Sequence, residues 1–232
     1  MARTADSEHS ATATVGRHYV GPLGERYYEW QRKLGREGAL LNVPFFAPHV
    51  GAEDRVIDFG CGGGFLLEAL EAREKTGIDP SEAARQEAAL RGMRVVASPD
   101  ALPAGSADVV ISNHALEHTL RPLDELIALR RLLRPGGRLF LMLPVDDWRT
   151  QRHADPDDVN HHLYTWTPVL LSNLIEEAGY ASIRTEIVTH GWPPQATRLR
   201  QSLGKHGYEA LAHGWAVLRR LRQVRASACR PA

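Results

Sequence analysis

Cysteine is scarce in this chain: only Cys61 and Cys229 are present, and they lie far apart in the sequence. Two distant cysteines exclude a disulfide framework and leave no closely spaced pair for a zinc knuckle. A chain without disulfides fits a reducing compartment, so we expect a cytoplasmic location.

Long apolar runs are also missing. No stretch is long enough to cross a bilayer, and the first residues contain no apolar segment typical of a signal peptide. We therefore expect no membrane span. Residues 1–15 are small and polar, which predicts a disordered leader, and a chain of 232 residues predicts one domain over 16–232.

Net charge is absent as well, because 28 Lys and Arg residues balance 28 Asp and Glu residues. Without an overall positive field, a nucleic-acid partner is not expected. The balance is uneven, however, since the chain from Arg198 onward contains one acid, Glu209, and many basic residues. These are either a solvated helix face or a site for an anionic substrate such as a sugar nucleotide. They are Arg198, Arg200, Lys205, Arg219, Arg220, Arg222, Arg225 and Arg230.

The most informative stretch is residues 55–65, which read as a buried strand, a glycine-rich turn and the start of a helix. The turn is not a dinucleotide fingerprint, because the position that needs the third glycine, counted from Gly60, holds Phe65. Asp58 would repel a pyrophosphate but can pair with an ammonium group. Asp79 ends the next short strand, where a carboxylate can hold a ribose diol. A nucleoside joined to an amino acid, without phosphate, describes S-adenosylmethionine.

These residues resemble the class I S-adenosylmethionine-dependent methyltransferases. Residues 58–64 are similar to the first motif of that family, and further matches follow in order at Asp79, at residues 112–118 and at residues 133–144. The family usually has an acid after the third strand to bind the adenine amino group. Here Ser98 stands at that place, with Asp100 two residues later. The resemblance implies cofactor contacts from Asp58, Gly60, Cys61, Gly62, Gly64, Asp79, Pro80, Ser98, Asp100, Asn113 and His114.

The fold implied by the resemblance is α/β, a seven-stranded Rossmann-like doubly wound sheet whose last strand is antiparallel. We expect an N-terminal lid of one or two helices over 16–50, with Pro44 breaking the second. The aromatic stripe of this segment is typical of core packing; in the alternative that the resemblance implies, Tyr27, Tyr28 or Trp30 contacts the cofactor or the substrate. Three further segments follow: a cofactor-binding core over 51–144, a substrate loop over 145–166 and a helical insert over 192–221. Strands are expected near 56–57 and at 76–79, 94–97, 107–112, 138–144, 181–189 and 223–230. Helices are expected at 66–70, 81–90, 122–133 and 169–178.

Histidines are the candidate general bases, since methyl transfer to a hydroxyl needs a group that titrates near neutrality. The candidates are His114, His118, His161 and His162. The Leu-Glu-His sequence at 116–118 also resembles the ubiquinone-biosynthesis O-methyltransferase and small-RNA 2′-O-methyltransferases. That resemblance implies an alternative in which His114, Glu117 and His118 bind a divalent metal from the first turn of a helix. Many methyltransferases of the Leu-Glu-His type have no metal, and we do not favour one here.

The function that we expect is S-adenosylmethionine-dependent methyl transfer to an O or N atom of a small molecule. Residues 160–166 and 190–194 resemble methyltransferases encoded among polysaccharide-assembly and natural-product genes, which implies a sugar, glycan or natural-product acceptor. Two alternatives remain open: an RNA methyltransferase, and a non-catalytic scaffold protein that binds the cofactor. The sequence gives no prediction of the oligomeric state.

Overall fold

The computed structural model describes residues 15–147, 149 and 151–232. The leader predicted over residues 1–15 therefore lies outside the described residues, apart from Val15. No helix among those described is both long and apolar enough to cross a membrane.

One seven-stranded sheet organises the structure, in the order β3-β2-β1-β4-β5-β7-β6. Neighbours are parallel from β3 to β5, whereas β7 lies antiparallel between β5 and β6. This topology confirms the predicted fold, including the reversed last strand. The strands are β1 (Arg55–Phe59), β2 (Glu74–Ile78), β3 (Arg94–Val96), β4 (Ala107–Asn113), β5 (Leu133–Val145), β6 (Ala181–Thr189) and β7 (Arg222–Cys229).

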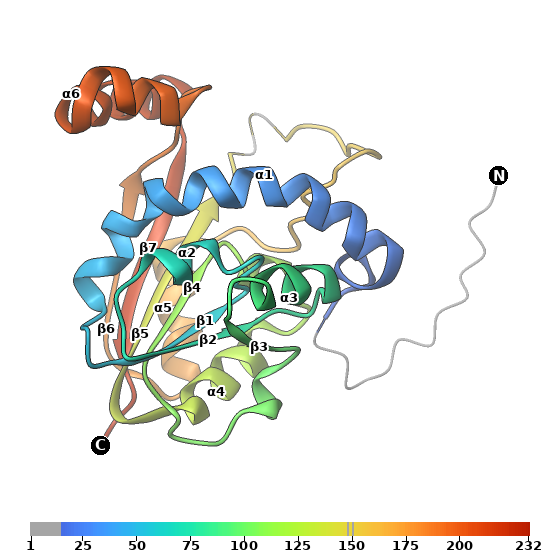
Figure 1. Cartoon of the computed structure of the whole chain (residues 1–232), viewed down its shortest axis with the longest axis vertical. Helices are drawn as coiled ribbons and strands as arrows, with labels where there is room; N and C mark the ends of the chain where they lie inside the picture. The colour runs from blue at the N-terminus through green and yellow to red at the C-terminus, as the bar shows by residue number, and fades with distance from the viewer. Residues whose placement is uncertain (1–14, 148, 150) are drawn as a thin grey trace.

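Helices cover both faces of the sheet (Figure 1). They are α1 (Gly21–Phe46), α2 (Phe65–Ala69), α3 (Glu82–Ala89), α4 (Pro122–Leu132), α5 (Pro168–Glu177) and α6 (Ala196–Arg219). Short 3₁₀ turns occupy Arg17–Tyr19, Ala47–His49, Pro99–Ala101 and Leu116–His118. Two helices begin at side-chain caps that match the sequence: Ser81 Oγ accepts from Ala84 N–H at 3.3 Å, and Thr167 Oγ1 accepts from Leu170 N–H at 3.2 Å.

The strands divide their side chains between two cores, because successive residues of a strand point to opposite faces. On β4, Val109 and Ile111 pack with Phe46 of α1 and Leu67 of α2, all at most 1% exposed. Val110 points the other way, into the core that α4 and α5 cover. Strands buried on both faces fix the sheet, and so fix the positions of the loops at its carboxyl edge.

The N-terminal segment is a single helix, so the prediction that Pro44 breaks it was wrong. Helix α1 continues through Pro44 to Phe46. A proline deprives the residue four positions earlier of its helical hydrogen bond. Here that carbonyl, Leu40 O, accepts a hydrogen bond from Arg200 Nη1 of α6 at 3.1 Å. A contact distant in sequence therefore compensates for the proline.

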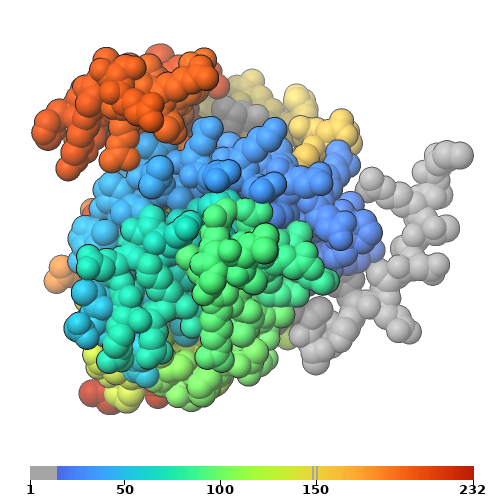
Figure 2. Space-filling view, viewed as in Figure 1, coloured from blue at the N-terminus to red at the C-terminus, as the bar shows by residue number. Residues whose placement is uncertain are grey.

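Two boundaries also differ from the prediction. Strand β5 begins at Leu133, before the start expected at residue 138, and its pairing with β4 shifts register between Ala107 and Val109. Helix α6 is interrupted at Gly204, whose φ of +67° is not helical. In Figure 2, α6 (orange) stands out from the body above α1 (blue).

Candidate functional site

A cavity of about 920 Å³ opens at the carboxyl ends of β1, β2, β4 and β5, and α1 forms one of its walls. Parallel α/β sheets bind their ligands at this edge. Tyr27, Tyr28 and Trp30 of α1 all line the cavity, as in the alternative that the resemblance implied. The volume is at the upper end of the roughly 300–1,000 Å³ common for ligand sites, so two small molecules can fit together.

The glycine turn forms the floor at one end of the cavity. Gly60 and Gly62 have φ of +74° and +52°, which side chains rarely adopt. A Cβ on Gly60 would also collide with the Cβ of Ala115. Cys61, Gly60 and Gly62 line the cavity, whereas Gly64 does not, because its Cα faces Met93 and Ala88 of the α3 region. Gly64 therefore serves the packing of α2 on α3, and we remove it from the predicted contacts.

Two buried carboxylates flank this turn. Asp58 is 2% exposed and lines the cavity. Its carboxylate accepts no hydrogen bond from the described residues. Burial, and then the charge of Asp79, raise the pKa of Asp58 well above its usual value. Asp79 accepts hydrogen bonds from the backbone N–H groups of Gly62 at 2.8 Å and Ser81 at 2.9 Å. Burial raises the pKa of Asp79, although these two bonds oppose the shift.

The residues predicted to contact adenine follow the third strand, β3. Pro80 and Ser98 line the cavity. Asp100 does not: its side chain is 91% exposed and lies 3.9 Å from Arg131 Nη2. The Pro99–Ala101 turn directs this carboxylate to solvent, so Ser98 alone of the two predicted residues is placed to contact a base.

Gln31 is a wall residue that the sequence did not indicate. It would lie 3.4 Å from a Cβ on Gly62, and its buried Oε1 has no hydrogen-bond partner among the described residues. Its side chain is one helical turn from Tyr27 and Tyr28, which line the same wall. In the sequence, only the spacing of the aromatic residues of α1 indicated this wall. A single glutamine among aromatic residues gives no indication of a binding role.

A second polar cluster surrounds Glu117, which is fully buried. Glu117 Oε1 lies 3.7 Å from His114 Nδ1, 3.9 Å from His118 Nε2 and 3.9 Å from His162 Nε2. Neither carboxylate oxygen has a hydrogen-bond partner among the described residues. Burial raises the pKa of Glu117 to about 8, so the carboxyl is largely protonated at neutral pH.

Tyr19 joins this cluster to the predicted substrate loop. Its hydroxyl donates to the carbonyl oxygens of Asn160 at 3.1 Å and His161 at 2.8 Å, and it lies 2.6 Å from His118 Nδ1. Since the only hydroxyl proton points to a carbonyl, we assign the His118 proton to Nδ1, where it is donated to Tyr19. Burial lowers the pKa of His118 to about 3, so this histidine is neutral.

The four candidate bases fall into different environments. His114, His118 and His162 line the cavity. Burial lowers the pKa of His114 to about 4. His162 Nδ1 lies 3.0 Å from Asp146 Oδ2, and its pKa is raised because Asp146 and Glu117 outweigh its burial. His161 does not line the cavity, because its backbone is left-handed (φ +52°) and its ring stacks on His18 outside.

The metal set predicted from the motif is not the one that the fold brings together. Residues 116–118 form a 3₁₀ turn rather than the start of an α-helix, and the donor atoms that all lie within 4.8 Å of one another belong to Glu117, His118 and His162, without His114. Both His162 ring nitrogens already have partners, Asp146 at Nδ1 and Asn160 Nδ2 at 2.7 Å from Nε2. A metal ion could bind here only if His162 Nε2 released Asn160.

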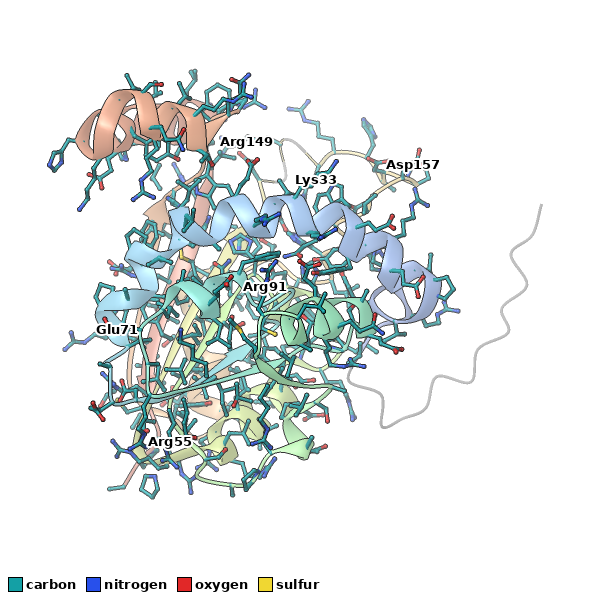
Figure 3. The ribbon with its side chains drawn as sticks, in the orientation of Figure 1. Lys33, Arg55, Glu71, Arg91, Arg149 and Asp157 are labelled. Atoms are coloured by element: carbon teal, nitrogen blue, oxygen red, sulfur yellow. The ribbon has the colours of Figure 1, made fainter. Side chains whose placement is uncertain are left out.

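The outer end of the cavity is formed by segments far apart in the sequence. Trp192 packs against α1 at Gly38, where a Cβ would collide with its ring, and Trp192 Nε1 donates to His190 Nε2 at 3.1 Å. Arg149 and the α6–β7 junction complete this end. Figure 3 labels Arg149, which lies between α1 and the base of α6 in this view.

Two comparisons of sequence agree with this geometry. The family described as "Methyltransferase domain" matches residues 27–213. The ubiquinone biosynthesis O-methyltransferase of Nitrosococcus oceani is 37% identical over 113 residues, which are 43% of this chain and 48% of that protein. The protein of the same name from Aromatoleum aromaticum is 41% identical over 101 residues, or 38% of this chain and 43% of its own length. The match thus spans less than half of either relative.

The solved structures agree on the fold. The crystal structure of a SAM-dependent methyltransferase from Archaeoglobus fulgidus has a TM-score of 0.62 and 18% identity, covering 88% of this chain and 99% of that one. At this identity the likeness shows the class I methyltransferase fold alone. Because the family match covers most of the chain, the protein belongs to the methyltransferase-domain family.

Proposed function

We propose that this chain transfers a methyl group from S-adenosylmethionine to an O or N atom of a small molecule, a sugar, glycan or natural-product intermediate. The observation that carries the proposal is the continuity of the cavity. It joins a glycine turn flanked by two buried acids to a cluster of three histidines. The curated relatives, named as O-methyltransferases, support transfer to oxygen.

The residues at the turn fit the cofactor because they offer separate groups for its ammonium group, its ribose and its adenine. Gly60 and Gly62 both have positive φ, which side chains rarely adopt, so bare backbone faces the ligand at this turn. Asp58, which is buried and has no hydrogen-bond partner among the described residues, would hold the ammonium group, and Asp79 would hold the ribose hydroxyls. Ser98 would contact the adenine edge. When bound, the cofactor supplies a methyl group already activated by a sulfonium.

His162 is the histidine best suited to act as the base. The low pKa values of His114 and His118 make both weak bases, whereas Asp146 holds the His162 ring and stabilises its protonated form. Nδ1–H of neutral His162 donates to Asp146, so Nε2 is the atom that can accept a proton. In our proposal the acceptor hydroxyl would replace Asn160 at Nε2, and His162 would take the hydroxyl proton there when the acceptor oxygen receives the methyl group.

The wall formed by α1 has a positioning role. Tyr27, Tyr28 and Gln31 line the cavity, with Gln31 next to Gly62 and the Tyr28 hydroxyl next to Gly63 of the glycine turn. Holding two reactants in line within such a site supplies much of the rate enhancement in a displacement reaction. Both cysteines are free thiols, which agrees with the cytoplasmic location that we propose.

Calorimetric titration with S-adenosylmethionine and S-adenosylhomocysteine, with and without EDTA, tests the proposal. We expect micromolar binding of both that EDTA leaves unchanged, followed by turnover in an acceptor screen that begins with nucleotide sugars. If a folded protein binds neither compound, the proposal fails. Binding without turnover of any acceptor would favour a non-catalytic scaffold.

A further inference from the structure

Four arginines meet at the outer mouth of the cavity, and we call them the arginine rim: Arg149, Arg219, Arg220 and Arg222. Arg149 follows β5 (Figure 3), the next two end α6, and Arg222 begins β7. Sheet pairing accounts for their meeting. Arg222 is opposite Val145 at the end of β5 and opposite Thr189 at the end of β6, so the α6–β7 junction lies over the start of the loop that carries Arg149.

The backbone directs the junction toward the mouth. Arg220 is in the left-handed region, with φ of +56°, and its N–H is bonded to the carbonyls of Ala216 and Val217. This cap ends α6 and reverses the chain into β7 within two residues. A non-glycine residue in this conformation is uncommon and is strained by about 1 kcal/mol. The fold therefore holds consecutive basic side chains at one fixed point.

Neighbouring acids neutralise only part of the rim. Asp147 lies 3.5 Å from Arg149, and Asp146 pairs with His162. Arg219 lies over the Trp215 ring at 5.6 Å. Within the described part of the chain, neither Arg220 nor Arg222 forms an ion pair. Three residues further along β7, by contrast, Arg225 pairs with Glu186 outside the cavity.

Charge is thus graded along one cavity. Its inner end carries the carboxylates Asp58 and Asp79, and its outer end carries the arginine rim, where Asp147 pairs with Arg149 and Arg220 and Arg222 form no ion pair among the described residues. We infer that the rim binds a phosphate or pyrophosphate group of the acceptor. This rests on the proposed function, because the acceptor's nucleophile must lie further in, near His162. Guanidinium groups bind phosphate oxygens through paired hydrogen bonds, and the acids at the inner end repel the same group.

The test is calorimetric titration with inorganic pyrophosphate and with uridine diphosphate, which does not compete for an adenine site. Each titration is run on the full chain both free and saturated with S-adenosylhomocysteine. We expect binding that weakens as salt rises. Arg220→Gln and Arg222→Gln should each weaken it about tenfold and leave S-adenosylhomocysteine binding unchanged. Arg225→Gln, on the same strand but outside the cavity, is the matched control.

A second arm distinguishes the two sources of the phosphate. Sedimentation with vesicles of phosphatidylglycerol, compared with phosphatidylcholine, tests a lipid-borne group. Pyrophosphate or uridine diphosphate binding that needs Arg220 and Arg222 identifies a soluble phosphorylated acceptor. Phosphatidylglycerol binding that needs them, without binding of the soluble probes, identifies a lipid-linked one.

Other outcomes overturn the inference. It is wrong if no probe binds, or if Arg222→Gln and Arg225→Gln change binding equally. Failure of the proposed function is recognised separately, as a folded chain that does not bind S-adenosylhomocysteine. The titrations of free protein still test the rim in that case.

Discussion

The carboxylate of Asp79 accepts a hydrogen bond from the backbone N–H of Gly62 at 2.8 Å. One side chain at the end of β2 thus fixes the glycine turn that follows β1. Its other oxygen accepts from Ser81 N–H, at the start of α3. Each oxygen keeps a lone pair, so Asp79 can hold a diol and the turn together.

Replacing Asp79 with Asn should weaken S-adenosylmethionine binding by about 1–3 kcal/mol, because a charge-assisted acceptor is lost. Calorimetric titration measures the change. Asp100→Asn is the control, since that carboxylate is exposed and outside the cavity. Unchanged binding by the Asp79 variant would remove this residue from the cofactor site.

Gly62→Val should abolish cofactor binding while the protein remains folded. Its φ of +52° costs an L-residue about 1–2 kcal/mol, and a branched side chain would fill the floor of the cavity. Gly214→Ala is a matched control, because a Cβ there meets no atom within 4 Å and the residue is in α6. Circular dichroism and calorimetry check both variants. Retained binding by Gly62→Val would show that the turn is not the cradle.

The stability of the protein should fall as pH rises from 6.5 to 8 because of Glu117. Its folded pKa of about 8 exceeds its usual 4.5, so the folded state holds a proton that the unfolded state has lost. Stability is therefore lost until the pH passes the folded pKa. Below pH 6.5, His114 and His118 have the opposite effect on stability. Their folded pKa values are depressed, so their contribution to stability is lost as the pH falls.

Comparison with Glu117→Gln isolates this contribution. The wild type should lose about 2 kcal/mol more than the variant between pH 6.5 and 8. Urea unfolding at intervals of half a pH unit measures both curves. Parallel curves would mean that Glu117 does not titrate in this range.

Tyr19→Phe should release the loop around Asn160, because the hydroxyl is within hydrogen-bond distance of two loop carbonyls and of His118. We expect a loss of about 1–3 kcal/mol in stability and faster amide exchange over 159–163. Tyr180→Phe is the control: its hydroxyl donates to Leu126 O on the other face of the sheet. If both variants change loop exchange equally, the Tyr19 contacts do not hold the loop.

His162→Asn should lower kcat roughly 10²–10⁴-fold with any hydroxyl acceptor found by screening, without loss of cofactor binding. His161→Asn should behave as the wild type, because that ring is outside the cavity. Steady-state rates across pH measure the difference. Equal effects of the two substitutions would exclude His162 as the base.

The sequence predicted features that depend on neighbouring residues. The glycine turn, the helix that begins after Ser81 and the strand over residues 181–189 follow from local conformation, and the structure has them where they were expected. The order of the strands came from the family resemblance rather than from any local pattern.

Features that depend on distant contacts were not predicted. The carbonyl of Leu40, which Pro44 leaves without its helical partner, accepts from Arg200, a contact that local rules cannot anticipate. His161 and His162 are equivalent in the sequence, and only the left-handed backbone at His161 separates their rings. Asp146 was one of several loop acids until the fold placed it against His162.

The position of β7 has a consequence for the order of synthesis. Strands β5 and β6 do not pair with each other, since the last strand of the chain lies between them. On the ribosome, β1, which carries Asp58, and β2, which Asp79 follows, are available well before β7. The cofactor end of the cavity can therefore assemble first, whereas its outer mouth must wait until β7 has left the ribosome exit tunnel.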